Sequence, residues 1–237
     1  MKTTYPMAWV VSPGRVEFQE RTFPPLGKKD VLVQIKAAAI CGSDLHIFKG
    51  RHPSAELPVA IGHEAAGQII TVGKEVSKHK VGERVAIEPV ITCGQCEFCK
   101  RGQYHLCVKI SFQYRRGQGA FTPYFVAPED RVYRLPDRIT YEEGALVEPL
   151  SVALHAQMKS GVQRGQTCAV FGAGALGVLI AALTRRAGAS RVFVSDINPF
   201  RLEKALELGA TDVINSLAVN PVEIIQTMTA QMGVDCT

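Results

Sequence analysis

The chain has 237 residues, of which 46% are hydrophobic and 21% are charged, and its formal net charge is +5. This composition supports a packed core of one large or two small domains, and it excludes disordered, collagen-like and disulfide-framework proteins. The basic pairs are scattered along the chain, as Lys28–Lys29, Lys100–Arg101, Arg115–Arg116 and Arg185–Arg186. A nucleic-acid-binding protein usually carries a denser basic stripe, so we expect no nucleic-acid partner.

The N-terminal part of the chain is predicted to be rich in β-strands. Apolar residues alternate along residues 31–37, which predicts a half-buried strand. Shorter strands are expected at residues 65–72 and 84–87, and glycine and proline punctuate the segments between them. From Tyr141 to Met158 the pattern becomes that of a helix. We place a domain boundary near the middle of this helix.

Residues 165–184 form a run of twenty positions without a charge, which is long enough to span a bilayer. Four glycines interrupt the run, and arginines flank both of its ends. We therefore expect a buried strand at 167–171 and a buried helix at 175–187, with no membrane partner. Because the N-terminus lacks the apolar run of an export signal, we expect a cytoplasmic protein.

Strands and helices are expected to alternate through the rest of the sequence. The expected elements are a strand at 191–195, a helix at 199–208, a strand at 212–214, a helix at 221–232 and a strand opening at 234. This order predicts a parallel sheet with crossover helices. A doubly wound dinucleotide fold contains two such halves, so we expect this sheet to be incomplete and the chain to be truncated. The two predicted domains are residues 1–150 and 151–237.

A GxGxxG motif runs from Gly172 to Gly177, between the predicted strand and helix. In this context the glycines allow a tight turn, a close approach of the backbone to pyrophosphate, and close helix packing. Asp196 ends the next strand, where a carboxylate binds the ribose 2′-hydroxyl and repels a 2′-phosphate, so we predict NAD rather than NADP. The predicted cofactor-binding residues are Gly172, Gly174, Leu176, Gly177, Asp196 and Arg201. Arg201 is expected either to contact the adenine or to stay an exposed helix residue.

Four of the seven cysteines crowd into one segment, as Cys93, Cys96, Cys99 and Cys107. The odd number and the missing export signal indicate a reducing compartment and a metal site rather than disulfides. Four thiolates satisfy a tetrahedral Zn²⁺ and leave no open position, so we predict a structural zinc lobe at residues 93–107. An iron–sulfur cluster is the alternative that the spacing leaves open.

A second group of candidate ligands lies in the segments Cys41-Gly-Ser-Asp-Leu-His46 and Gly62-His63-Glu64. A catalytic zinc takes three protein ligands and keeps one position for water or substrate. Cys41 and His63 suit such a site, with Glu64 or a distant carboxylate as the third ligand. Taken alone, His63 would more often be a packed core histidine.

The pattern Gly62-His63-Glu64-x2-Gly67-x5-Gly73 resembles the zinc signature of the medium-chain dehydrogenase/reductase family, the zinc alcohol dehydrogenases. The segment 41–46 and the four-cysteine lobe also resemble those of this family. The resemblance implies a GroES-like β domain with the zinc sites, followed by a Rossmann-type domain. It further implies two Zn²⁺ ions and NAD per chain, and a dimer or tetramer of the full-length protein.

The resemblance also implies roles for single residues. Cys41 and His63 would hold the catalytic zinc together with Glu64 or with Glu148, although Glu148 could instead only cap a helix. Asp44 would orient His63, unless it is a surface turn residue. The implied path of the alcohol proton runs through Ser43 and His46.

Residues 84–89 and 143–152 resemble the polyol dehydrogenases, including sorbitol and xylitol dehydrogenase. The implied reaction takes a hydride from a secondary alcohol of a polyol or sugar-derived substrate to NAD. Ile47 departs from the aromatic residue of animal sorbitol dehydrogenases, and residues 41–48 are also similar to threonine dehydrogenases. The alternatives are therefore an L-threonine or sugar-acid dehydrogenase, or an inactive zinc-binding fragment.

Overall fold

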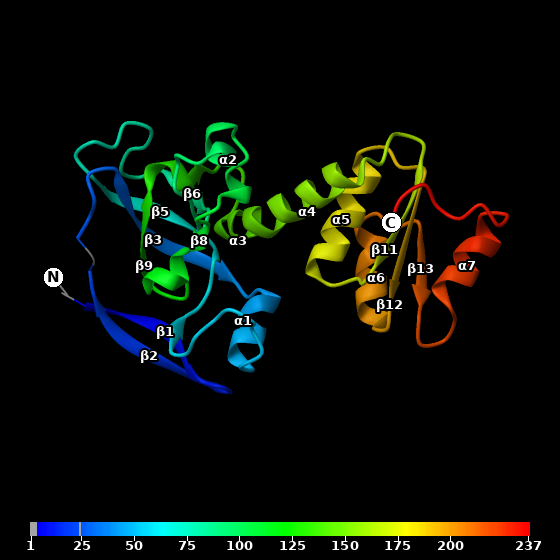
Figure 1. Ribbon diagram of the computed structural model, residues 1–237, viewed down its shortest axis with the longest axis horizontal. Coiled ribbons are helices and arrows are strands. Elements are labelled where there is room, and N and C mark those ends of the chain that lie inside the picture. The colour runs from blue at the N-terminus through cyan, green and yellow to red at the C-terminus, as the bar shows by residue number, and fades with distance from the viewer. Residues whose placement is uncertain (1–3, 24) are drawn as a thin grey trace. The chain divides into compact units, whose positions relative to one another are not determined.

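The computed structural model describes residues 4–23 and 25–237. The chain divides into two compact units, of which the first ends at Glu148 and the second begins at Pro149 (Figure 1). Across the described residues, no helix combines the length and the hydropathy that a bilayer crossing needs.

The first unit is built around a five-stranded antiparallel sheet with the strand order β10-β6-β5-β3-β9. Its strands are β3 (Asp30–Ala39), β5 (Glu64–Val72), β6 (Arg84–Ile87), β9 (Tyr124–Pro128) and β10 (Val132–Arg134). The strands predicted at 31–37, 65–72 and 84–87 are confirmed as β3, β5 and β6. This sheet carries the largest core of the unit.

Alternation along the strands decides which side chains enter that core. Val31 and Val33 lie two residues apart on β3, point to the same face and are fully buried. Ile69, Val85 and Phe125 reach the same cluster from three other strands. Burial of each such side chain contributes about 1.5–3 kcal/mol to folding.

Two small sheets complete the strands of this unit, in the orders β2-β1-β4 and β7-β8. They consist of β1 (Thr4–Ser12), β2 (Arg15–Thr22), β4 (Val59–Ala60), β7 (Val90–Ile91) and β8 (Ser111–Phe112). The sequence did not predict them. In β1 four consecutive residues, Met7 to Val10, are buried, so no alternation is visible, and strands of two residues carry no period at all.

Short helices connect these strands. They are α1 (Gly42–Phe48), α2 (Glu97–Lys100) and α3 (Tyr141–Ala145), with 3₁₀ turns η1 (Tyr104–Leu106), η2 (Gln113–Arg116) and η3 (Glu129–Arg131). The longer helix α4 (Val147–Ser160) begins at the end of the first unit and continues into the second. The helix predicted from Tyr141 to Met158 is therefore two helices. A capping box starts the first of them, because Thr140 and Glu143 each accept a hydrogen bond from the other's backbone N–H.

The second unit contains a three-stranded parallel sheet in the order β11-β12-β13. Its elements are β11 (Thr167–Phe171), α5 (Ala175–Arg186), β12 (Arg191–Asp196), α6 (Pro199–Leu208), β13 (Asp212–Asn215) and α7 (Pro221–Met228). The predicted alternation of strands and helices is confirmed. The uncharged run 165–184 is a strand followed by a helix.

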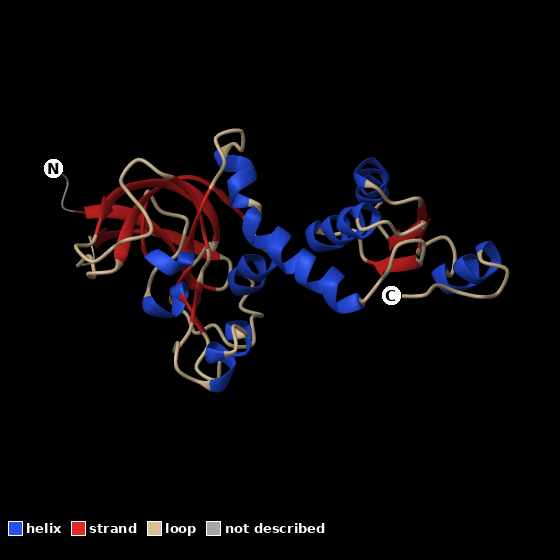
Figure 2. Ribbon diagram, turned by 90° about the horizontal axis from the view of Figure 1, so that it is seen from above, coloured by secondary structure: helices blue, strands red, loops and turns tan. Residues whose placement is uncertain are grey.

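Helices cover both faces of this parallel sheet (Figure 2). Val192 and Val194 of β12 pack in a cluster with residues of α5 and α6, whereas Phe193 packs on the opposite face with Ile225 of α7. A strand buried on both faces needs a continuous apolar run, which is what Val192 to Val194 provides.

The C-terminal end differs from the prediction in two ways. The helix predicted at 221–232 ends at Met228, because Ala230 and Gln231 have positive φ angles of 50° and 67° that no right-handed helix can continue. The strand predicted from residue 234 is a single parallel bridge from Cys236 to Cys168. Since Cys168 already pairs with β12 on its other side, β11 has pairing partners on both edges.

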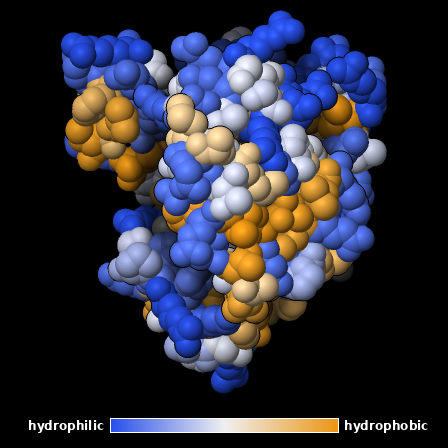
Figure 3. All heavy atoms as spheres, turned by 90° about the vertical axis from the view of Figure 1, so that its right-hand side faces the viewer, coloured by the Kyte–Doolittle hydropathy of each residue, from blue (hydrophilic) through white to orange (hydrophobic). Residues whose placement is uncertain are grey.

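The face that includes α7 also exposes apolar side chains, seen in orange in Figure 3. The exposed large hydrophobic residues in and around α7 are Leu217, Val219, Val222, Met228 and Met232. An exposed apolar patch of this kind is typical of a contact surface.

Candidate metal and nucleotide sites

The four cysteines of the lobe come together around one point. The Sγ atoms of Cys93 and Cys99 lie 4.0 Å apart, those of Cys96 and Cys99 3.5 Å apart, and those of Cys107 and Cys93 3.5 Å apart. All four sulfur atoms lie within 4.8 Å of one another. A tetrahedral zinc with Zn–S bonds of 2.3 Å would separate its sulfur ligands by roughly 3.8 Å. The donor set and its spacing therefore fit Zn²⁺.

Backbone N–H groups point at the sulfur atoms of this cluster. The N–H groups of Cys93 and Lys109 both donate to Cys107 Sγ at 3.3 Å, and that of Cys96 donates to Cys93 Sγ at 3.4 Å. Hydrogen bonds from backbone N–H groups also lower the pKa of Cys96 to about 6. These contacts favour the thiolate form, which binds metal, at Cys93 and Cys96. Desolvation and the neighbouring thiols raise the pKa of Cys99 to about 11 in the metal-free chain.

A polar network ties the lobe to the strands of the first unit. Glu88 Oε2 accepts hydrogen bonds from Tyr133 at 2.7 Å and from Arg131 at 3.2 Å. Arg131 also donates to Thr92 Oγ1 at 2.8 Å, and its guanidinium lies over the ring of Tyr104 at 4.6 Å. No local sequence pattern predicts this network, because its members are far apart along the chain.

A second cluster of donor atoms consists of Cys41, His63 and Glu64, all within 4.8 Å of one another. Cys41 is the N-cap residue of α1, His63 directly precedes β5, and Glu64 is the first residue of that strand. One thiol, one imidazole and one carboxylate are a set of ligands that suits zinc with an open position.

Asp44 contacts the backbone and the imidazole of this cluster. Its side chain is only 4% exposed, so it is no surface turn residue. Its Oδ2 accepts a hydrogen bond from Cys41 N at 2.9 Å, and its Oδ1 accepts one from Gly62 N at 3.1 Å. The Nδ1 atom of His63 lies 3.6 Å from Asp44 Oδ1. Asp44 thus connects the start of α1 to the residue that precedes β5.

The charges of the cluster stabilise one another. Burial lowers the pKa of His63, but hydrogen bonds to Asp44 and Cys41 more than offset it and raise that pKa to about 10. The hydrogen bond with His63 lowers the pKa of Cys41 against the opposing effect of burial. Burial would raise the pKa of Asp44, yet its contacts with His63 and the backbone hold it below the usual value. Without metal, Asp44 and Cys41 therefore stabilise the protonated form of His63.

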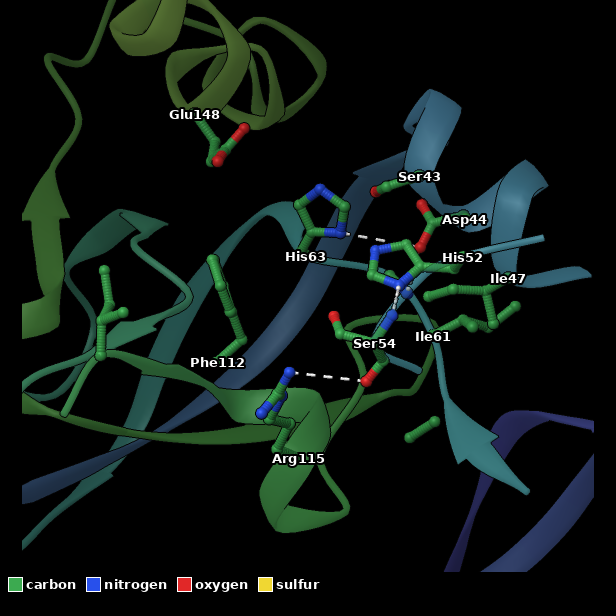
Figure 4. Close-up of a pocket in the computed structure, with 13 residues that line it drawn as sticks. Ser43, Asp44, Ile47, His52, Ser54, Ile61, His63, Phe112, Arg115 and Glu148 are labelled. Carbon is green, nitrogen blue, oxygen red and sulfur yellow. Dashed lines mark hydrogen bonds and ion pairs between the residues drawn. The ribbon is translucent and has the colours of Figure 1, made fainter. Parts of the chain in front are cut away.

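A cavity of about 390 Å³ opens beside this cluster (Figure 4). Its lining residues are Ser43, Asp44, Ile47, His52, Ser54, Ala60, Ile61, Gly62, His63, Ile110, Phe112, Arg115 and Glu148. Ser43 and Glu148, both predicted from the sequence, share the cavity with His63. Burial raises the pKa of Glu148. His46 is exposed on α1 and does not belong to the lining.

The lining residues that the sequence analysis missed include His52, Ser54, Phe112 and Arg115. They come from the loop before β4 and from the segment around η2. These segments are far apart in the sequence and come together only in the fold. The spacing of neighbouring residues therefore could not predict that they share a cavity.

The glycine motif lies between the end of β11 and the start of α5. Gly172 has a φ angle of +104°, which favours glycine, and its N–H donates to Ser195 O at 2.7 Å. A Cβ atom at Gly177 would lie 1.8 Å from Gly172 O, whereas a Cβ at Gly174 would meet nothing within 4 Å. Gly174 is the N-cap of α5, so open space surrounds the positive end of this helix.

Asp196 ties the end of β12 to this loop. Its Oδ2 accepts a hydrogen bond from Ala173 N at 2.7 Å, and its Oδ1 accepts one from Asn198 N at 2.8 Å. Burial would raise the pKa of Asp196, but these backbone hydrogen bonds and the charge of Arg201 lower it. Arg201 Nη1 lies 3.9 Å from Asp196 Oδ2, with about half of the arginine side chain exposed. Leu176, within the motif, is exposed on the first turn of α5.

Two family profiles match the chain. The alcohol dehydrogenase GroES-like domain matches residues 27–137, and the zinc-binding dehydrogenase matches residues 175–237. The first range contains both clusters of donor atoms, and the second contains Gly177 and Asp196. These matches confirm the predicted fold class, a GroES-like β-rich unit followed by a Rossmann-type parallel sheet.

Known dehydrogenases match nearly the whole length of this chain. Sorbitol dehydrogenase of Bacillus subtilis (strain 168) is 41% identical over 224 residues, which are 93% of this chain and 64% of that protein. The chain thus spans less than two thirds of this relative. An oxidoreductase/dehydrogenase of unknown specificity from Escherichia coli superposes with a TM-score of 0.92 at 35% identity, over 98% of this chain and 69% of the other. An alcohol dehydrogenase from Escherichia coli CFT073, complexed with NADH, gives a TM-score of 0.89 at 30% identity, over 97% and 67% of the two chains.

Proposed function

Because the chain belongs to the zinc-binding alcohol dehydrogenase family, we propose that it oxidises a secondary alcohol of a polyol or sugar-derived substrate with NAD as hydride acceptor. The observation that carries this proposal is the convergence of Cys41, His63 and Glu64 beside a cavity that also holds Ser43. The likeness to a sorbitol dehydrogenase supports the polyol class of substrate.

We propose two zinc ions for each chain. Cys93, Cys96, Cys99 and Cys107 would hold a structural ion without an open position. Cys41, His63 and Glu64 would hold the catalytic ion. Glu64 is favoured over Glu148 as the direct third ligand, because the donor atoms that lie within 4.8 Å of one another include that of Glu64.

The two bound groups would supply the chemistry: zinc as a Lewis acid that lowers the pKa of the substrate hydroxyl, and nicotinamide as the hydride acceptor. The residues of the chain position the substrate and move its proton. Ser43 lines the cavity, so its hydroxyl can accept the alcohol proton there. His46 follows one turn later on α1 and is exposed, which suits a group that passes the proton to water.

For the nucleotide, we propose the loop at Gly172–Gly177 as the pyrophosphate site and Asp196 as the ribose ligand. The Asp196 carboxylate has two oxygens with about four acceptor positions, so hydrogen bonds to Ala173 and Asn198 leave room for ribose hydroxyls. A negative charge at this place disfavours the 2′-phosphate of NADP.

The proposal is tested by zinc analysis and by NADH formation with sorbitol, xylitol, galactitol, an aldonate and L-threonine. We expect two zinc ions per chain and turnover of at least one sugar-derived alcohol, with turnover lost and zinc retained in Ser43→Ala. Full activity of Ser43→Ala would remove Ser43 from the proton path. Absence of zinc, or turnover of L-threonine alone, would contradict the proposed function.

Replacing Asp196 by asparagine is expected to relax the choice of nucleotide. Asparagine keeps one acceptor oxygen and the size of the side chain but removes the charge that repels a phosphate. Since charge-assisted hydrogen bonds contribute about 1.5–3 kcal/mol, the preference for NAD over NADP should fall by about tenfold or more. Calorimetric titration with both nucleotides measures the preference. Glu203→Gln on α6 is the matched control, and an unchanged preference in Asp196→Asn would contradict the assignment.

Zinc binding at Cys41 and His63 is expected to strengthen with rising pH. Zinc takes a neutral imidazole, whereas Asp44 and Cys41 keep His63 protonated up to a pKa of about 10 in the metal-free chain. Zinc must therefore displace this proton, so its affinity should rise by about tenfold or more per pH unit between pH 7 and 9. Competition with a chelator at several pH values measures the slope. Asp44→Asn should flatten it, and a slope of zero in the unmodified chain would contradict the expectation.

A further inference from the structure

We propose that Arg115 makes the cavity selective for a substrate that carries an anionic group, a carboxylate or a phosphate, away from the hydroxyl that is oxidised. This inference rests on the proposed function, because it takes the cluster of Cys41 and His63 as the place where the hydroxyl is held. It narrows the proposed substrate class, polyols and other sugar-derived alcohols, to sugar acids and sugar phosphates.

Arg115 offers its charge to the cavity without a carboxylate partner in the part of the chain that the structure describes. It belongs to η2 and lines the cavity. Its one side-chain hydrogen bond among the described residues runs from Nη2 to Ser54 O, at 3.5 Å. A guanidinium has five N–H donors in a planar fork that matches carboxylate and phosphate oxygens. Most of these donors are therefore available to an anionic ligand.

His52 adds a second donor on the same side. Ser54 N donates to His52 Nδ1 at 3.3 Å, so Nδ1 is an acceptor and carries no proton. With Nδ1 as the acceptor, Nε2 is the ring nitrogen that can donate to a ligand. Ser54 thus contacts both His52 and Arg115, as the dashed lines in Figure 4 show.

The carboxylates of the lining lie by His63, away from Arg115. Asp44 is buried beneath His63 and already accepts hydrogen bonds from Cys41 and Gly62. Figure 4 shows Glu148 across His63 from Arg115. An anionic group is repelled from these two carboxylates and attracted to the guanidinium.

The polarity of the cavity therefore gives a substrate one orientation. Its hydroxyl would face the cluster at His63 and its anionic group would face Arg115. The apolar side chains of Ile47, Ile61 and Phe112 also line the cavity, and an apolar lining strengthens an ionic contact. A neutral polyol gains none of this attraction.

Calorimetric titration of the zinc-loaded chain tests the inference with three matched ligands: D-sorbitol, D-gluconate and D-sorbitol 6-phosphate. The two anions separate the carboxylate and phosphate classes on the same carbon skeleton. We expect at least one of them to bind about 10- to 100-fold more tightly than sorbitol, as a charge-assisted pair allows. The difference should shrink in high salt.

Variants at η2 assign the effect to one side chain. Arg115→Gln should remove most of the preference for the anion. Arg115→Lys should keep part of this preference, because lysine has the same charge but lacks the planar set of guanidinium donors. Arg116→Gln changes the net charge equally at a neighbouring exposed position outside the lining and should keep the preference. Arg115 is exposed, and the circular dichroism and zinc content of each variant confirm folding.

Two results would overturn the inference. One is equal binding of sorbitol and both anions, which leaves the proposed function standing. The other is a preference for anions that Arg115→Gln retains or that Arg116→Gln loses equally. If no ligand binds the zinc-loaded chain, the inference also fails, whereas the proposed function is decided separately by zinc content and NADH formation.

Discussion

Replacing Cys96 by serine is expected to remove one zinc ion per chain and to unfold the lobe at residues 93–107. A serine hydroxyl stays protonated and does not replace a thiolate ligand. Apart from the contacts of Tyr104 with Glu88 and Arg131, the lobe has little else to hold it, because its helices have only four and three residues and Cys107 is its one buried cysteine. In small zinc domains the metal supplies about 10–16 kcal/mol of folding free energy, which no contact of this lobe can replace.

Metal analysis and amide hydrogen exchange measure the two effects. Zinc should fall from about two ions to one per chain, and exchange protection should be lost in the lobe while β3 and β5 keep theirs. Cys236→Ser is the matched control, since this cysteine lies outside both clusters of donor atoms and should retain both ions. Iron with visible absorption in the unmodified chain would favour the iron–sulfur alternative and contradict a zinc site.

Features that depend on short spacing could be located from the sequence. The four cysteines span fifteen residues, and the glycine motif spans six, so their geometry is largely set by the local chain. The parallel strands β11 and β12 were also located, because each is a continuous apolar run between turn signals. In each case neighbouring residues carry the whole pattern.

The cavity could not be predicted in this way. Ser54 and Arg115 lie 61 positions apart and meet only after the sheet of the first unit has formed. The sequence also left the third zinc ligand open. Glu64 directly follows His63 in the chain, whereas Glu148 is the carboxylate that the family resemblance implies. The distances between the donor atoms of Cys41, His63 and Glu64 favour Glu64 as this ligand. The order of residues in a sequence does not contain such distances.

Replacing Gly177 by alanine is expected to weaken NAD binding and to destabilise the second unit. The new Cβ would lie 1.8 Å from Gly172 O, a backbone atom that no rotamer change can move. Either α5 or the loop must shift, at a cost of about 1–3 kcal/mol for overpacking. The N–H groups at the start of α5 then lose their alignment with the pyrophosphate. Loss of two such hydrogen bonds would reduce affinity by about 100-fold.

Gly174→Ala separates the effect on the ligand from the effect on the fold. No atom lies within 4 Å of the added Cβ, and a φ angle of −69° suits alanine, so thermal stability should change by less than about 0.5 kcal/mol. NAD binding should still fall, because the Cβ would occupy the space into which the pyrophosphate comes close to the backbone.

Thermal melts and NAD titrations of both variants therefore distinguish two roles of the motif. Gly177 would serve the packing of α5 against the loop, and loss of this packing appears without any ligand. Gly174 would serve the close approach of the nucleotide, and its loss appears only when NAD is added. Equal melting temperatures for the two variants, or NAD affinity unchanged in Gly174→Ala, would contradict this division. Equal melting temperatures would show that the loop at Gly172 can shift without loss of stability. Unchanged NAD affinity would show that the pyrophosphate binds elsewhere.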